Sequence, residues 1–231
     1  FAAGQTTQLV TVQTTDDTDF EEAETFTITF SGSSLNASVQ AVGTINNDDV
    51  NPSLVVQTFT LTTGSDSFTG KDADDTFTAA DGTLTSLDTL AGGSGSDTLT
   101  AVLSGDTVNL NTTSVEQINL SNTGVSTVNF ESASGVTGVK VSDMDASATT
   151  TITLENIQAA VAATLANLRS DGAAEHNTVV IDFDGDAISG TSDDVLVTLD
   201  DVVDTEITFT REGTNTVETI SIHTVNEAST I

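Results

Sequence analysis

Gly92-Gly93-Ser94-Gly95-Ser96-Asp97-Thr98-Leu99-Thr100 is the stretch of sequence that decides the fold. It matches the nine-residue consensus G-G-x-G-x-D-x-U-x, in which U is a large apolar residue, at every specified position. Glycine adopts positive-φ turns at little steric cost. The stretch therefore predicts a tight turn followed by a very short strand, from which the large apolar residue points inward.

Partial copies of this pattern fill residues 53–103. Asp66-Ser67-Phe68-Thr69 is followed nine residues later by Asp75-Thr76-Phe77-Thr78. Asp88-Thr89-Leu90 is followed nine residues later by Asp97-Thr98-Leu99. A fixed phase of aspartate and apolar residue argues against the alternative, which is a flexible linker rich in Gly, Ser and Asp.

The repeated aspartates and glycines suit calcium. This ion takes about six to eight hard oxygen ligands and mixes carboxylates with backbone carbonyls. A glycine turn exposes carbonyls, an aspartate adds a carboxylate, and stacked turns would let two aspartates share an ion. The predicted ligands are Asp66, Asp75, Asp88, Asp97, Gly93 and Gly95.

Residues 104–145 continue with looser rungs. Apolar-polar-apolar triplets recur there, as expected for stacked short strands: Val108-Asn109-Leu110, Ile118-Asn119-Leu120, Val128-Asn129-Phe130 and Val139-Lys140-Val141. Further strands are predicted at 179–183, 195–199, 206–210 and 219–222. One segment differs, because Ile157, Val161, Leu165 and Leu168 have helical spacing among alanines. This spacing predicts a helix near 155–168.

Residues 1–49 read as a separate strand-rich segment. Alternating apolar and polar residues predict strands around Val10 and Val12, over Phe26 to Phe30, and over Val39 to Ile45. Asn51-Pro52 contains the only proline and marks a boundary. We predict a domain over 1–50, a linker over 51–57 and a second domain over 58–231. The rung pattern stops midway at the last residue, so we expect the second domain to be truncated there.

Charge and composition limit the partners. The chain has 35 acidic residues against four basic ones, a formal charge of −31. Such a charge repels itself in the compact state and disfavours nucleic acid and anionic lipid. Divalent cations or salt would neutralise it; the alternative is a halophilic, solvated surface. There is no cysteine, hence no disulfide. No apolar run approaches the ~18 residues needed for membrane insertion.

The nonapeptide region resembles a known family. Residues 58–103 look like the calcium-binding repeats of the RTX (repeats-in-toxin) group, although Lys71-Asp72-Ala73-Asp74 lacks the glycine pair. From Phe59 onward the chain is similar to bacterial S-layer and adhesin proteins that carry such repeats. The phrases Phe59-Thr60-Leu61-Thr62-Thr63-Gly64-Ser65-Asp66 and Val217-Glu218-Thr219-Ile220-Ser221-Ile222 carry this likeness. The family implies a parallel β-roll, type I secretion and calcium-triggered folding.

Residues 1–49 are similar to the C-terminal half of a Calx-β domain, an immunoglobulin-like sandwich associated with calcium. The likeness rests on Phe1-Ala2-Ala3-Gly4, on Phe20-Glu21-Glu22-Ala23-Glu24-Thr25-Phe26 and on Ile45-Asn46-Asn47-Asp48-Asp49. It implies ligand roles for Asp16, Asp17, Glu21, Asp48 and Asp49. The first strands of such a sandwich would precede Phe1 in a longer protein or come from another chain by strand addition.

A third acidic segment is Asp182-Phe183-Asp184-Gly185-Asp186, with Asp193 behind it. The phasing of Asp182, Asp184, Asp186 and Asp193 is that of an EF-hand loop, but the glycine stands at the fourth place and strands flank the segment. An acidic turn on a strand hairpin explains it nearly as well.

Catalytic signals are weak. Neither G-x-S-x-G nor H-E-x-x-H occurs, and we expect surface or packing roles for His176 and His223. We therefore expect no enzyme but an all-β, calcium-binding structural protein of the bacterial cell surface, secreted and extracellular. It would be an S-layer or extracellular filament subunit that forms a homo-oligomer or polymer. A cell-surface polysaccharide or host surface is a further expected partner. The alternatives are the stalk of a secreted RTX adhesin and the calcium-binding tail of a secreted hydrolase.

Overall fold

The computed structural model describes residues 7, 9–15, 17–32, 38–144, 149–159, 161–169, 176–186, 188, 193–211, 217 and 219–225. The chain divides into two compact units, Phe1–Pro52 and Ser53–Ile231. This division falls inside the predicted linker, residues 51–57. The single helical element among the described residues is the 3-10 turn η1 (Pro52–Leu54). No helix in this part of the chain is long and apolar enough to cross a membrane.

The first unit contains an antiparallel pair of strands, β1 (Glu24–Phe30) and β2 (Val39–Ile45). Both strands were predicted, and both are confirmed. Gly43 in β2 lies under the ring of Phe26, where a methyl group would come within 2.3 Å of the ring. The strand predicted around Val10 and Val12 is wrong, because the described residues 9–15 form no strand. Val10 and Val12 are 50 % and 46 % exposed there, so no apolar layer covers them.

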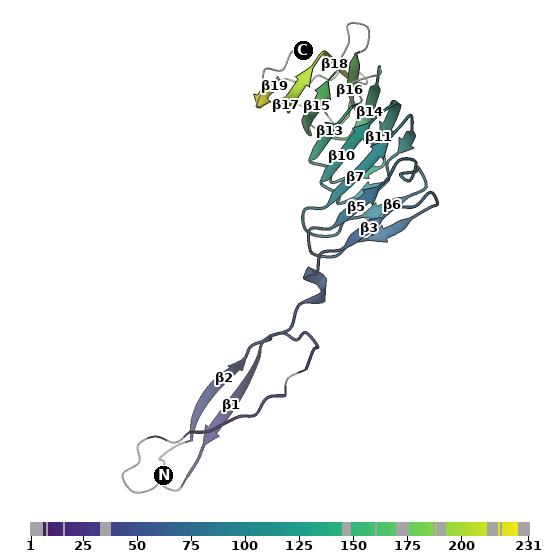
Figure 1. The fold of residues 1–231 in the computed structure, drawn as a ribbon. Coiled ribbons are helices and arrows are strands. Elements are labelled where there is room, and N and C mark those ends of the chain that lie inside the picture. Colours follow the sequence, from purple (N-terminus) through teal and green to yellow (C-terminus); the bar gives the residue numbers. More distant parts are fainter. Residues whose placement is uncertain are drawn as a thin grey trace. The chain divides into compact units, whose positions relative to one another are not determined.

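The second unit is a parallel β-solenoid, in which successive coils stack strand on strand (Figure 1). We call the eight-stranded sheet "sheet I". It is ordered β19-β17-β15-β13-β10-β7-β5-β3. In chain order its strands are β3 (Thr58–Thr60), β5 (Thr76–Ala79), β7 (Thr98–Leu103), β10 (Gln117–Asn122), β13 (Gly138–Ser142), β15 (Ala162–Arg169), β17 (Asp194–Val203) and β19 (Thr219–Val225).

Two further sheets close the coils. Sheet II has the strands β8 (Thr107–Asn109), β11 (Val125–Asn129), β14 (Thr151–Ile157), β16 (Asn177–Phe183) and β18 (Thr205–Arg211). Sheet III has the strands β4 (Ser67–Thr69), β6 (Thr89–Ala91), β9 (Thr112–Thr113) and β12 (Ala133–Ser134). The parallel roll expected from the sequence is thus confirmed, as are the four strands predicted between residues 179 and 222.

The coils lengthen along the chain. Equivalent positions are 18 residues apart at Gln57 and Asp75, but 34 residues apart at Arg169 and Val203. The first coils use sheets I and III, the next two use all three sheets, and the later ones use sheets I and II. The nine-residue repeat is therefore half of a short coil, and it sends successive aspartates to opposite sides of the roll.

The core is a stack of inward-facing side chains. In sheet I, Phe77, Leu99 and Ile118 lie over one another in register, and each is 0 % exposed. In β5 and β7, threonines alternate with Phe77 and Leu99 along the strand, which suits its pleated surface. Near the start of the solenoid, the rings of Phe59 and Phe68 and those of Phe59 and Phe77 stack with centroids 5.0 Å apart.

The helix predicted near residues 155–168 is wrong. This segment contains the end of β14, a turn and most of β15. Ile157, Leu165 and Leu168 are buried, as a helix face would be, but for another reason. Asn156 and Asn167 have left-handed backbone, with φ of 55° and 53°. Each interrupts the strand alternation, so the neighbouring buried residues lie three positions apart and imitate helical spacing.

Left-handed residues form a ladder along one corner of the solenoid. Asp143, Asn167 and Asp201 occupy equivalent positions in consecutive coils, with φ of 54°, 53° and 59°. The Asn167 Nδ2 donates to Asp143 Oδ1 at 3.1 Å, and Arg169 forms an ion pair with Asp201. Asn and Asp tolerate this backbone conformation better than other side chains do. The ladder therefore sets where each long coil bends.

We predict that Asn167→Val lowers the free energy of unfolding by about 1–3 kcal/mol relative to Asn167→Gly, because a β-branched residue is strained at positive φ. Both variants lose the bond to Asp143, so their difference isolates the backbone. Urea denaturation measures it. Thr164→Val, in the same strand with ordinary backbone, is the control and should be nearly neutral. Equal stability of the two Asn167 variants would contradict the left-handed assignment.

Candidate metal centres

The repeat aspartates bind backbone groups of neighbouring turns. Asp75 is 1 % exposed. Its Oδ1 accepts the N–H of Gln57, one coil earlier, at 2.5 Å, and its Oδ2 accepts the N–H of Lys71, in its own turn, at 2.7 Å. Backbone N–H groups that leave a sheet ladder need such acceptors. Each carboxylate therefore fixes its own turn against the next.

Asp66 and Asp88 repeat this arrangement on the opposite side of the roll. The Asp88 carboxylate accepts the N–H of Asp66 and that of Thr85, both at 2.8 Å. Asp66 in turn accepts the N–H of Thr62 at 2.7 Å. The predicted ligands thus form two columns, Asp66 with Asp88 and Asp75 with Asp97. Hydrogen bonds already engage both carboxylate oxygens of Asp75 and of Asp88.

Asp97 differs from the other three. Its Oδ1 accepts the N–H of Asp75 at 2.6 Å, but its Oδ2 is buried and has no hydrogen-bond partner. Gly93 holds the place that corresponds to Lys71 in the preceding coil. Its backbone has φ of 107° and does not supply the bond that Lys71 gives to Asp75. The complete glycine repeat therefore coincides with an unpartnered carboxylate oxygen.

A second oxygen faces the same place. A methyl group on Gly92 would lie 1.8 Å from the carbonyl oxygen of Ser114 and 2.3 Å from Asp97 Oδ2. Only glycine fits at this position, because a Cβ would clash with both oxygens. Two acceptors with no donor between them suit a proton or a cation, and a carboxylate with a carbonyl is a donor pair that Ca²⁺ accepts. Asp97, Ser114 and the Gly93–Gly95 turn are therefore the residues that would hold an ion.

Burial raises the pKa of Asp97 above its ordinary value, the hydrogen bond from Asp75 lowers it, and the negative charges of Glu116, Asp75 and Asp74 raise it again. The net direction is upward. The folded chain therefore disfavours the ionised Asp97, and a cation beside Oδ2 would offset that cost.

The first unit brings three predicted ligands together. Carboxylate oxygens of Asp17, Glu21 and Asp49 lie within 4.8 Å of one another, in a hollow of about 380 Å³. Asn47 holds them in place, because its Oδ1 accepts the N–H of Glu21 at 3.1 Å and its Nδ2 donates to the Asp49 carbonyl at 2.7 Å. The charge of Asp17 is the main cause that raises the pKa of Glu21. Asp48 is exposed and outside this cluster, and Asp16 is outside the described residues.

The third acidic segment does not converge. Asp182 Oδ1 accepts the hydroxyl of Thr210 at 2.6 Å, and Asp184 Oδ1 accepts the N–H of Asp186 at 2.8 Å. Asp193 stands directly before β17. In the part of the chain that the structure describes, these carboxylates form no group of three with a common centre. The geometry favours the acidic-turn interpretation.

Two acceptors in the solenoid were not anticipated. Glu116 Oε2 accepts the N–H of Asp97 at 2.8 Å and continues the Asp75 column. Ser126 Oγ accepts the N–H groups of Gly105 and Asp106 on another side. Glu116 follows Asp97 by 19 residues, where the preceding step is 22, and it has no glycine turn. The nonapeptide pattern therefore gave no signal for it.

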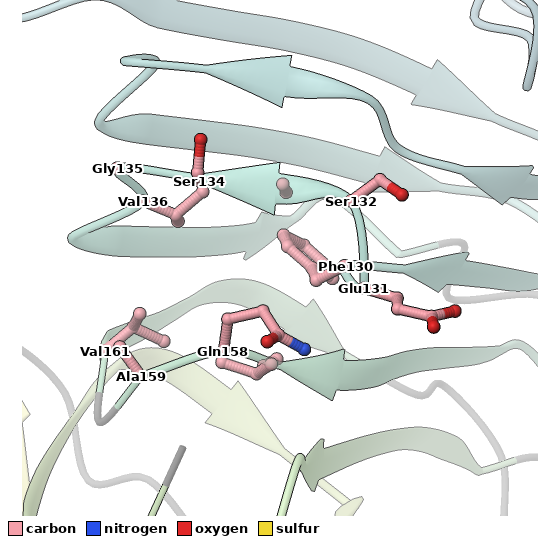
Figure 2. A pocket seen from close by; sticks show the side chains of 11 residues that line it. Phe130, Glu131, Ser132, Ser134, Gly135, Val136, Gln158, Ala159 and Val161 are labelled. Atoms are coloured by element: carbon pink, nitrogen blue, oxygen red, sulfur yellow. The ribbon is translucent and has the colours of Figure 1, made fainter. Parts of the chain in front are cut away.

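A separate cavity of about 390 Å³ lies where sheet III ends (Figure 2). It is bounded by residues 130–136 of the coil that contains β12 and by residues 157–159 and 161 of the next coil, which has no strand in sheet III. Among the described residues of its lining, Glu131 is the only ionisable one.

No protein-family model, curated protein or solved structure matched the chain.

We predict that Asp97→Asn stabilises the calcium-free protein by about 1–3 kcal/mol at neutral pH, the range for one buried polar group, because the amide can donate to the Ser114 carbonyl. Asp75→Asn should destabilise it, since both Asp75 oxygens already accept N–H groups. Urea denaturation with a chelator measures both changes.

The raised pKa of Asp97 also gives a pH dependence. The folded state binds this proton more tightly than the unfolded state does, so the calcium-free wild type should gain stability as pH falls from neutral through the raised pKa. Asp97→Asn should lack that part of the gain. If Asp97→Asn and Asp75→Asn changed the free energy of unfolding in the same direction, the hydrogen-bond geometry described for these two aspartates would be contradicted.

Proposed function

We propose that this chain is a calcium-stabilised structural module of a secreted bacterial surface protein, and that it assembles with further copies of itself. The observation that carries the proposal is the buried Asp97 carboxylate, whose Oδ2 has no hydrogen-bond partner and lies, together with the Ser114 carbonyl oxygen, against Gly92. The resemblance to RTX and S-layer proteins supports the same conclusion.

Calcium fits the donor set better than other common metals do. Every candidate ligand is a carboxylate or carbonyl oxygen, and cysteine is absent from the chain. Hard oxygen donors select Ca²⁺ or Mg²⁺ over the thiolate- and imidazole-binding metals. Backbone carbonyls in a turn favour Ca²⁺, since Mg²⁺ demands near-ideal octahedral geometry and keeps several waters.

Ion binding would act on folding because the site does not exist in the unfolded chain. Asp97, Ser114 and Gly92 belong to turns that meet only when the coils stack. Binding free energy at such a site is folding free energy. The net charge of −31 works in the same direction, since bound cations relieve the repulsion among 35 acidic residues.

A structural role is supported by the repetitive fold. Solenoids expose long, regular surfaces and are stabilised coil by coil, which suits a scaffold. Copies with a charge of −31 repel one another, and salt screens that repulsion only in part. Calcium would lower the charge and so permit close contact between copies.

We predict that Ca²⁺ at about 100 times its dissociation constant stabilises the solenoid by about 2.7 kcal/mol, the value for one site that only the folded state binds. Chelation should reduce strand content. Circular dichroism of the whole chain and isothermal calorimetry with CaCl₂ measure both effects, and MgCl₂ tests selectivity.

Asp97→Asn should remove most of this gain. Asp81→Asn is the matched control: it also removes one negative charge, but Asp81 is exposed in a turn and is not a candidate ligand, so the gain should persist. An unchanged spectrum and melting curve with and without calcium at low salt would overturn the calcium role.

We further predict that assembly depends on calcium. Light scattering at millimolar CaCl₂ should show particles larger than a monomer. These particles should dissociate after chelation. A monomer under both conditions would reject the lattice and favour the adhesin stalk. Equal assembly without calcium would leave a structural role in place but remove ion neutralisation as its cause.

A further inference from the structure

We propose that the residue four places before Asp75 and before Asp97 decides whether a backbone N–H or a calcium ion compensates the carboxylate. Lys71 supplies the N–H for Asp75, whereas Gly93 leaves Asp97 to the ion. This inference deepens the proposed function and rests on it, because it names the residue that selects the partner of the carboxylate. It limits the nonapeptide region, residues 53–103, to a single calcium site.

Two consecutive coils present the same pair of oxygens. A Cβ atom on Gly70 would lie 2.0 Å from the carbonyl oxygen of Gly92 and 2.3 Å from Asp75 Oδ2. A Cβ atom on Gly92 would lie 1.8 Å from the carbonyl oxygen of Ser114 and 2.3 Å from Asp97 Oδ2. Both aspartates also accept, at Oδ1, an N–H group from one coil earlier. The surroundings of the two carboxylates can therefore be compared directly.

The two coils differ in one hydrogen bond. The Lys71 N–H donates to Asp75 Oδ2 at 2.7 Å, but Asp97 Oδ2 has no hydrogen-bond partner. Asp75 and Asp97 are 1 % and 0 % exposed, so their burial is the same. The presence or absence of a donor in the turn is what distinguishes them.

Gly93 is the cause of this difference. Its φ of 107° is a backbone conformation that glycine adopts far more readily than other residues do. A Cβ atom on Gly93 would also lie 2.0 Å from the carbonyl oxygen of Lys71. The same carbonyl accepts the N–H of Ser94 at 2.8 Å, so the second turn packs directly on the first. A residue with a side chain would have to leave the conformation in which its N–H does not reach Asp97.

The aspartates on the opposite side of the roll follow the same rule. Thr62 stands four places before Asp66 and donates its N–H to Asp66 Oδ2 at 2.7 Å. Thr85 stands three places before Asp88 and donates its N–H to Asp88 Oδ2 at 2.8 Å. Neither donor is glycine. Among these four repeat aspartates, Asp97 alone lacks an N–H from its own turn.

A backbone N–H and a calcium ion compete for a buried carboxylate oxygen. The N–H carries a partial positive charge that stabilises the ionised carboxylate. A cation that displaced this N–H would leave a buried donor without an acceptor, which costs free energy. Where the turn supplies no N–H, a cation meets no such cost, and Ca²⁺ accepts both carboxylate and carbonyl oxygens. We therefore expect an ion at Asp97 and none at Asp75.

A variant that gains a site tests this. Lys71→Gly/Ala73→Gly completes the consensus G-G-x-G-x-D-x-U-x over residues 70–78 and permits a turn like that of Gly93. Isothermal calorimetry of the whole chain with CaCl₂ should show one ion more per chain than the wild type. Lys71→Ala/Ala73→Gly is the matched control. It removes the same positive charge, but alanine disfavours positive φ, so the number of ions should stay that of the wild type.

The reverse change gives a second measurement. Gly93→Ala should turn the N–H of this residue toward Asp97 and weaken calcium binding there by about 10- to 100-fold, the range for one buried hydrogen bond. Circular dichroism in calcium checks that the variants keep the strand content of the wild type. Equal calcium affinity of Gly93→Ala and the wild type would overturn the inference.

The outcomes separate the inference from the proposed function. If Asp97→Asn loses an ion but Lys71→Gly/Ala73→Gly gains none, the inference fails and the calcium role stands. An ion gained by the alanine control as well would assign the effect to the lysine charge and would also reject the inference. If Asp97→Asn loses no ion, the proposed site fails, whereas an ion gained only by the glycine variant would still support the role of Lys71.

Discussion

The stacking of the coils depends on acceptors for the backbone N–H groups that lie between strands. Within sheets I, II and III, neighbouring coils satisfy each other's backbone. At the turns the ladder stops, and side-chain oxygens take over, from Asp75 and Asp97 on one side to Asp88 on the other. A buried N–H without an acceptor would cost about 1–3 kcal/mol. Much of the acidic content of the early coils therefore serves the fold directly.

This solution places negative charge inside the roll. Asp75, Asp88 and Asp97 are each at most 2 % exposed, and no basic side chain bonds to them among the described residues. Hydrogen bonds to both oxygens make the charge tolerable at Asp75 and Asp88. At Asp97 one oxygen has none, and burial raises its pKa. The same carboxylates that join the coils thus include one, Asp97, whose buried negative charge is only partly compensated by hydrogen bonds.

The sequence predicted the solenoid because inward and outward residues alternate in short, regular triplets. It did not predict the length of a coil, since a nine-residue repeat fits either a whole turn or half of one. The helix error at 155–168 has a definite cause: left-handed Asn156 and Asn167 shift the alternation, and apolar periodicity carries no information about φ.

At the candidate site the sequence indicated Asp97 but not Ser114 or Glu116. These two come from the following turn, and only the stacking register brings them close. The acidic cluster of the first unit was better anticipated, because its resemblance already pointed to Asp17, Glu21 and Asp49. The role of Asn47 in holding that cluster was not.

The parallel direction of every strand in the solenoid makes its two ends chemically different. Sheet I begins with the three residues of β3 and ends with the seven of β19. The coils also differ in length, from 18 residues between Gln57 and Asp75 to 34 between Arg169 and Val203. A copy of the chain that slipped along another copy by one coil would therefore not meet the same surface again.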